Sequence, residues 1–274
     1  MAINIPYLEH SYFYIDKPVP YTIDNQTIYI KPIELADSEI FLSSIDLFMI
    51  DKNSSPSVEI IQMSYLDFVL KVMLQEDENN RYKLINILCL SLGWKSPIIK
   101  QNNKGKLLLG DAETGILINS KQFEEIRRII LYQNIPHFDD SYVNPEIKEV
   151  VAEIDSIKNK NVDIPSLERK IGIITAHCGL PKREQMLMTY RSHSILFEEV
   201  CGEIEFITVR PIAVYAGKDK ELDHWIYKKK KNKYDGYFTS EEQYSRSMGG
   251  DGKVKSSSSI TGDILQQQFS SFTK

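Results

Sequence analysis

The chain has 274 residues with 33 Lys and Arg against 38 Asp and Glu, so its net charge is −5. This charge repels polyanions and argues against a nucleic-acid coat protein. Apolar residues make up 42% of the chain, enough to build a core without disulfides or metal ions. The N-terminus lacks a signal-peptide pattern, and no stretch approaches the roughly 18 apolar residues of a membrane span. We therefore expect a soluble protein that is not secreted.

Three cysteines, Cys89, Cys178 and Cys201, make an odd number. Each lies in an apolar, helix-like run, where a free thiol packs as a small hydrophobic group. We expect all three to be reduced and mostly buried.

The first segment is predicted to form a β-hairpin followed by a helix. Two β-rich runs, residues 21–23 and 27–30, flank a polar turn, and Pro32 ends the second run. Asp37 and Ser38 can cap a helix that ends near residue 51.

Helical periodicity dominates the next segment. Ser64 is a favourable N-cap for a helix over residues 65–75, in which apolar residues recur at intervals of three and four. A second apolar helix covers residues 82–92, and Gly93 stands where a C-terminal cap is expected.

Glycines then bound two short apolar runs, residues 107–109 and 116–118, which predict a second hairpin. Asn119 and Gln122 have the spacing of a capping box and predict a helix that follows it. The buried stripe of that helix is expected to be Phe123, Ile126, Ile130 and Leu131.

Further helices are predicted after residue 143. Asn144 and Pro145 form a strong helix start, and that helix should run to about residue 158. Pro165 opens another helix, which Gly179 closes.

A short helical turn is predicted from Lys182, and Thr189 can cap a longer helix. Residues 204–215 favour a strand locally, although the preceding helix could also continue through them. The short joints between the helices after Pro145 predict that they run antiparallel.

The C-terminal residues differ in composition. From residue 245 the chain is rich in Gly, Ser and Gln, which predicts a flexible extension. Four apolar residues in it lie close to a helical stripe that can fold on a partner, although a featureless tail fits equally well. They are Ile264, Leu265, Phe269 and Phe272.

These elements predict a mainly α chain of the α+β class, with antiparallel helices, small N-terminal and central β-hairpins and a flexible C-terminal tail. Its expected regions are an N-terminal hairpin and helix (residues 1–63), a helical core (64–236) and a low-complexity tail (237–274).

One basic block has aromatic residues beside it. Between residues 218 and 236, seven lysines face four acidic residues. A solvated lysine run is the simplest interpretation, and an acidic protein partner or a nucleic acid are the alternatives. The lysines of the block are Lys228, Lys229, Lys230, Lys231 and Lys233.

The residues that could carry chemistry do not form a recognisable motif. His177 and Cys178 are adjacent, so on a helix they point about 100° apart, which predicts Cys178 in the core and His177 near the surface. Residues 137–140 could bind a cation or act as acid and base, but they look like an ordinary connection. His193 and Cys201 lie roughly 12 Å apart along one helix, too far for a thiolate pair. We therefore predict no catalytic residue, metal or cofactor.

Several short segments of the sequence resemble those of tailed-bacteriophage tail-assembly chaperones and baseplate-hub assembly proteins. The resemblance extends over about residues 10–235. The resemblance lies in residues 28–32, 49–54, 63–68, 123–130, 132–134 and 165–168. It implies assembly work in the cytoplasm of an infected bacterium, with partners such as the tape-measure protein and no catalytic residues. The alternatives are a structural tail subunit of the virion and a nucleic-acid-processing enzyme that uses Lys228 to Lys231.

Overall fold

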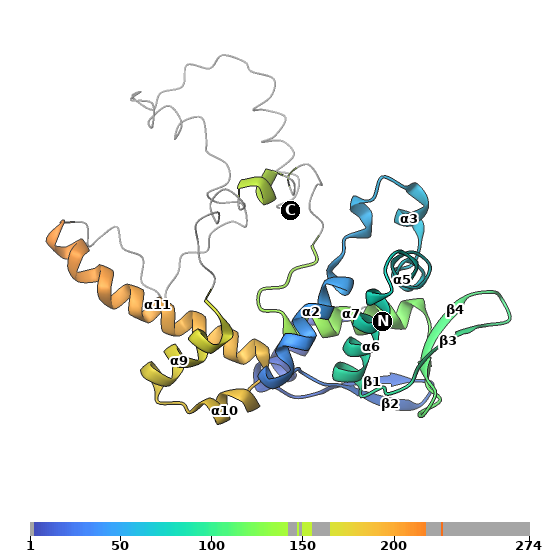
Figure 1. Cartoon of the computed structure of the whole chain (residues 1–274), viewed down its shortest axis with the longest axis horizontal. Helices are drawn as coiled ribbons and strands as arrows, with labels where there is room; N and C mark the ends of the chain where they lie inside the picture. The colour runs from blue at the N-terminus through green and yellow to red at the C-terminus, as the bar shows by residue number, and fades with distance from the viewer. Residues whose placement is uncertain (1–2, 142–146, 148–149, 155–164, 218–225, 227–274) are drawn as a thin grey trace, which may run out of the picture. The chain divides into compact units, whose positions relative to one another are not determined.

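The computed structural model describes residues 3–141, 147, 150–154, 165–217 and 226 (Figure 1). Contacts group Met1–Pro145 with Val162–Ile226 in one unit, and Glu146–Asn161 with Tyr227–Lys274 in another. The elements below belong to the first unit, and the predicted boundary at residue 63 falls inside it.

Helices predominate in the described residues, with two small antiparallel sheets, which confirms the mainly α, α+β class. The helices up to residue 76 are α1 (Ile5–Ser11), η1 (Phe13–Ile15), η2 (Leu35–Asp37), α2 (Ser38–Met49), η3 (Lys52–Ser54), α3 (Val58–Gln62), α4 (Tyr65–Phe68), η4 (Val69–Met73) and α5 (Leu74–Glu76). The later helices are α6 (Asn79–Leu92), α7 (Ser120–Asn134), α9 (Leu167–Cys178), α10 (Lys182–Leu187) and α11 (Tyr190–Tyr215).

The predicted N-terminal hairpin is present. β1 (Val19–Ile23) pairs antiparallel with β2 (Gln26–Ile30). The turn has two residues, Asp24 and Asn25, with φ of 44° and 67°. Both lie in the left-handed region that a tight hairpin turn of this twist requires, and Asp and Asn tolerate it best after glycine. Gln26 therefore belongs to β2 and not to the turn.

The helix predicted over residues 65–75 forms as α4, η4 and α5 in succession. Ser64 caps it, since its Oγ accepts a hydrogen bond from the Asp67 N–H at 3.0 Å. The middle part, η4, is a π-helical turn, which the periodicity did not predict.

The predicted central hairpin is part of a three-stranded sheet in the order β3 (Pro97–Gln101), β4 (Leu107–Asp111), β5 (Leu117–Ile118). β3 was not predicted, because its two adjacent isoleucines show no alternation. Gly110 on β4 is required, because a Cβ there would lie 2.2 Å from the Ile116 carbonyl oxygen.

α7 crosses the centre of the core. Asn119 and Gln122 form the predicted capping box, and all four residues of the predicted stripe are buried. The Phe123 ring lies 5.5 Å from that of Phe48 and 6.5 Å from that of Tyr65, so the core joins segments from both sides of residue 63.

The direction of the helices differs between the two halves of the chain. Lys83 pairs with Asp46, and Asn86 with Ser44, so α2 and α6 are antiparallel. α9 and α11 instead run in the same direction, because α10 turns the chain between them. Their contacts, Lys170 on Phe197 and His177 on Glu203, follow the same order along both helices. The antiparallel prediction was therefore wrong for this pair.

Two other expectations have clear outcomes. Residues 204–215, left open between strand and helix, continue α11. The helix predicted from Asn144 to about residue 158 falls largely outside the described residues, and it is helical at 147 and 150–154.

The prediction of mostly buried cysteines was wrong. Cys89 and Cys178 are exposed, and Cys201 is partly exposed. Apolar neighbours in the sequence do not fix the helix face: the buried stripe of α6 includes Leu88, and Cys89 points about 100° away from it. Cys178 is the last residue of α9, so it lies beyond the buried part of that helix. His177 is exposed beside it, as expected.

Candidate functional site

The sites predicted from sequence lie outside the described residues. This holds for the tail residues and for the basic block, which therefore stay predictions: Ile264, Leu265, Phe269, Phe272, Lys228, Lys229, Lys230, Lys231 and Lys233.

Hydrogen bonds attach the start of α11 to the N-terminal segment. Thr189 caps the helix, since its Oγ1 accepts from the Ser192 N–H at 3.1 Å. The same hydroxyl donates to the Asp16 carboxylate at 2.7 Å, and the Ser192 hydroxyl donates to it at 2.9 Å. Backbone hydrogen bonds beside it join Leu35 to Met188, and Tyr190 to Ile33, both at 2.8 Å.

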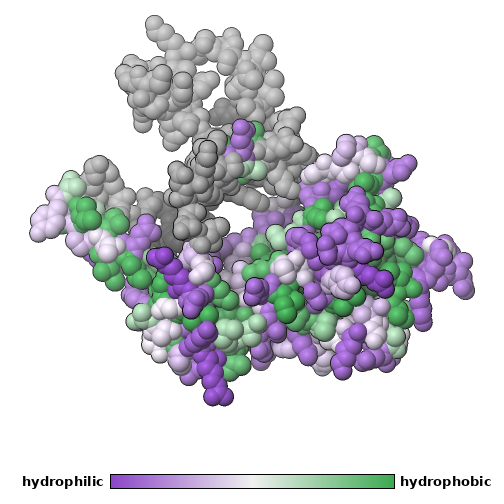
Figure 2. All heavy atoms as spheres, in the orientation of Figure 1, coloured by the Kyte–Doolittle hydropathy of each residue, from purple (hydrophilic) through white to green (hydrophobic). Residues whose placement is uncertain are grey.

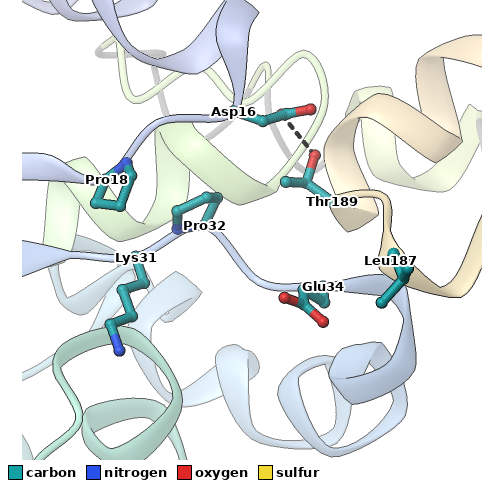
Figure 3. A pocket seen from close by; sticks show the side chains of 7 residues that line it. All are labelled: Asp16, Pro18, Lys31, Pro32, Glu34, Leu187 and Thr189. Atoms are coloured by element: carbon teal, nitrogen blue, oxygen red, sulfur yellow. Dashed lines mark hydrogen bonds between the residues drawn. The ribbon is translucent and has the colours of Figure 1, made fainter.

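A small hollow of about 270 Å³ lies at this joint (Figure 3). Its lining combines carboxylates, one lysine and apolar side chains, namely Asp16, Pro18, Lys31, Pro32, Glu34, Leu187 and Thr189. The Thr189 hydroxyl is engaged on both sides, by Asp16 and by the Ser192 N–H, so it acts as a helix cap and not as a nucleophile. The hollow thus lies where the residues just before α11 meet the segments on either side of the N-terminal hairpin.

A buried polar network holds α9, α10 and α11 together. Gln185 is 0% exposed, and its Nε2 donates to the Ile171 carbonyl (3.2 Å), the Thr175 hydroxyl (2.9 Å) and the Leu180 carbonyl (2.8 Å). Its Oε1 lies 3.1 Å from His193 Nε2. Because that oxygen only accepts, the His193 ring carries its proton on Nε2. Burial, together with the charge of Lys170, lowers the pKa of His193, so the ring is neutral.

Arg191 makes a second nonlocal connection. Its guanidinium donates to the Tyr132 carbonyl oxygen, lies 5.9 Å from the Phe13 ring and pairs with Glu9 at 3.6 Å. The side chain is almost fully buried, so it joins α11 to both α1 and α7. Neither Arg191 nor His193 was singled out as structural from the sequence.

The segment 137–140 connects helices through its side chains. His137 Nε2 lies 2.8 Å from Glu198 Oε2 on α11. Burial alone would raise the pKa of Asp140, but hydrogen bonds from Arg128 and Tyr132 outweigh it and lower that pKa below its usual range. The side chains of this segment are engaged in hydrogen bonds with neighbouring helices. Such contacts suit a structural connection better than acid–base catalysis.

The far end of α11 has the opposite character. Ile207, Ile212 and Val214 are 58%, 68% and 58% exposed. Between residues 204 and 215 the only charged residues are Glu205 and Arg210, and apolar side chains occur around the whole circumference. Figure 2 shows hydrophobic side chains along this end of the helix. A helix that is apolar all round is normally buried. We call residues 204–215 the distal segment of α11.

Two kinds of feature have no candidates among the described residues. None of their helices combines the length and hydropathy that a membrane span needs. Within the same ranges, His, Cys, Asp and Glu form no group of three or more that could bind a metal ion. The exposure of Ile207, Ile212 and Val214 makes the distal segment the candidate functional site, and the chemistry it offers is apolar contact.

Comparison with known proteins gives no relative: no family model, curated protein or solved structure matches the chain.

Proposed function

We propose that this chain is a non-enzymatic assembly protein of a bacteriophage tail or baseplate. It acts in the cytoplasm of the infected bacterium and binds a tail component, such as the tape-measure protein, through the distal segment of α11. The observation that supports the binding role is the exposure of Ile207, Ile212 and Val214 on a stretch of helix that carries only two charged residues. The assignment to a bacteriophage comes from the resemblance of short sequence segments to tail-assembly and baseplate-hub assembly proteins.

The energetics favour association through this segment. Burying a large apolar side chain contributes roughly 1.5–3 kcal/mol, so several of them together can offset the cost of association, on the order of 4–15 kcal/mol. The segment lies beyond the polar contacts that fix the start of α11, so a partner can cover it without disturbing the core.

The test uses a phage that encodes the chain. Ile207→Ser combined with Ile212→Ser removes two exposed apolar side chains, and Ile99→Ser on β3, 51% exposed, is the matched control. We expect the double variant to melt like the wild type while infected cells accumulate capsids without normal tails under the electron microscope. Normal tails with the double variant, or equal defects with Ile99→Ser, would contradict the proposal.

Mass spectrometry of purified particles separates an assembly factor from a virion subunit. An assembly factor is absent from finished particles, whereas a structural tail subunit is present in fixed stoichiometry. We expect absence.

A further inference from the structure

The hairpin of β3 and β4 carries a local positive charge on a chain whose net charge is −5. Residues 95–110 contain four lysines and no Asp or Glu, and we call them the lysine hairpin. The lysines are Lys95, Lys100, Lys104 and Lys106, and all four are exposed. None of them forms an ion pair with a described residue. A chain that repels polyanions as a whole thus has a local patch that attracts them.

Two of these lysines are neighbours on the outer face of the hairpin. The register places Lys100 opposite Leu108. The ladder extends beyond the strands, because the Asn102 N–H donates to the Lys106 carbonyl oxygen at 2.9 Å. Lys106 is therefore the diagonal neighbour of Lys100, about 7–8 Å away on the same face. Leu109 is 1% exposed, so the opposite face packs on the core. Like charges this close repel each other, and a bound anion relieves the repulsion.

Asp67 on α4 is a carboxylate close to this patch. Burial alone would raise the pKa of Asp67, but hydrogen bonds from Lys71 and Ser64 outweigh it and lower that pKa below its usual range. The charge of Lys106 adds to the lowering, so Lys106 lies near Asp67. The ion pair of Asp67 is with Lys71, at 2.7 Å. One carboxylate thus faces two lysines, which leaves an excess of positive charge.

The turn of the lysine hairpin is held in shape by side chains. Asn102 Oδ1 accepts from the Lys104 N–H and from the Lys106 N–H, both at 2.9 Å. Gln101 Nε2 donates to the Gly105 carbonyl oxygen at 2.8 Å. Figure 1 shows this turn extending away from the helices, and Figure 2 shows hydrophilic side chains at its tip. Because the backbone is fixed in advance, binding an anion there costs little ordering of the chain.

Protection of a sheet edge explains only part of the lysine pattern. β3 is an edge strand, and Pro97 and Lys100 are residues of the kind that keep an edge from pairing with another strand. Lys104 lies in the turn, and Lys106 precedes β4, the central strand of the sheet. Edge protection does not require either of them, so their charge is available for binding.

We propose that the lysine hairpin binds the phosphate backbone of double-stranded DNA through Lys100, Lys104 and Lys106. This inference goes beyond the proposed function and does not depend on it. Lysine binds phosphate as a point charge, whereas carboxylates are matched best by the planar fork of arginine, which residues 95–110 lack. A DNA duplex carries one negative charge per about 1.7 Å of its axis, a higher density than that of an extended acidic peptide, whose residues are about 3.3 Å apart.

The composition of the lysine hairpin favours a duplex over a single strand. Residues 95–110 contain no Phe, Tyr or Trp on which unpaired bases could stack. Two strands about 4.8 Å apart form a ribbon that the major groove of DNA, about 12 Å wide, can admit. Phosphate contacts carry no sequence information, so binding should not depend on the base sequence.

The test measures binding of the full chain to a fluorescent DNA duplex of about 20 base pairs by anisotropy, between about 50 and 200 mM salt. Three phosphate contacts predict a slope of about −2.7 in a plot of log affinity against log salt concentration. Lys100→Gln combined with Lys104→Gln and Lys106→Gln should weaken binding at least about tenfold and flatten the slope. Thermal melting should show this variant folded.

Two other triple variants with the same change of charge locate the site. The first changes exposed lysines elsewhere: Lys17→Gln, Lys31→Gln and Lys182→Gln. The second changes the basic block: Lys228→Gln, Lys229→Gln and Lys230→Gln. We expect both to bind DNA within about threefold of the wild type. No binding by the wild type, or a loss in either control as large as that of the hairpin variant, would overturn the proposal.

Poly-glutamate with the same number of charges as the duplex tests an acidic protein partner. It should compete less well than unlabelled duplex, and equal competition would assign the hairpin to an acidic protein and overturn the proposal.

Acetylation of lysines in the wild-type chain, read by mass spectrometry, gives an independent map of the contact. DNA should protect Lys100, Lys104 and Lys106 and leave Lys17 and Lys182 reactive. Protection confined to lysines outside the hairpin would overturn the proposal.

Discussion

The two halves of α11 differ in the interactions that their side chains make. The first half, residues 190–203, is held by specific polar contacts: Ser192 with Asp16, Arg191 with Tyr132, and His193 with Gln185. The distal segment has apolar side chains on all sides and few polar ones.

This difference gives the two halves of one continuous helix different physical properties. Buried polar groups are costly unless paired, so they permit only one arrangement of the first half. Apolar contacts are non-directional, so the distal segment can accept a surface that the described part of the chain does not supply. Mutations in the two halves should therefore affect different measurements.

The largest effect is expected from Gln185→Ala in the network that holds the first half. The change removes the Gln185 hydrogen bonds to the Ile171 and Leu180 carbonyls and leaves the buried His193 ring without its acceptor. The Leu180 carbonyl keeps its hydrogen bond from the Thr175 hydroxyl. We expect a loss of about 3–5 kcal/mol in the free energy of unfolding, measured by urea denaturation. Gln62→Ala, at an exposed position on α3, is the control and should change it little. A similar small change for both would show that the network is not needed to fix α11.

The next effect should be confined to the distal segment. Pro211 lies inside α11 and has no N–H to donate, and proline costs about 3 kcal/mol relative to alanine in a helix interior. Pro211→Ala should therefore slow amide hydrogen exchange in residues 204–215 by up to about 100-fold. The melting temperature should stay the same, because this segment lies outside the core. A raised melting temperature would show that the two halves unfold together.

A smaller effect is expected where α11 begins. Asp16→Asn keeps a residue that tolerates the left-handed φ of 53° but removes the charge that accepts from Thr189 and Ser192. We expect a loss of about 1 kcal/mol in urea denaturation. Asp24→Asn is the matched control, because Asp24 has a φ of 44° in an exposed turn. An equal loss in both variants would assign the effect to the backbone and not to the carboxylate.

The smallest effect is a pH dependence from His193. Burial lowers its folded pKa below the unfolded value of 6.5, so the unfolded chain binds a proton that the folded chain excludes. The stability due to neutral His193 is complete above pH 6.5 and is lost as the pH falls from there toward the folded pKa. Urea midpoints measured between about pH 7.5 and 5 should fall less steeply for His193→Gln than for the wild type. Gln62→Ala, at an exposed position that carries no titrating group, should keep the wild-type slope.

The sequence predicted the elements whose determinants are local. Ser64, Asn119 and Thr189 each cap a helix through a hydrogen bond to a residue two or three positions away, so the pattern is readable without the fold. The hairpin turn at Asp24 and Asn25 is local in the same way.

What the sequence did not predict depends on distant partners. His193 and Gln185 form a pair only because α10 folds back between α9 and α11, and periodicity gives no direction for two helices. β3 becomes a strand by pairing with β4, and its own residues show no alternation. The distal segment was ambiguous because its composition fits a strand as well as a helix, and its exposure follows from where α9 ends.

The hydrogen bond between Ser192 and Asp16 also has a kinetic consequence. These residues are 176 positions apart, and closing a flexible loop of that length costs about 4–5 kcal/mol of entropy. The hairpin at residues 19–30 closes a loop of only two residues and can form early. A chain emerging from the ribosome can therefore form its hairpin long before α11 is attached. The Asp16 carboxylate has no Ser192 hydroxyl to bind until residue 192 has been made.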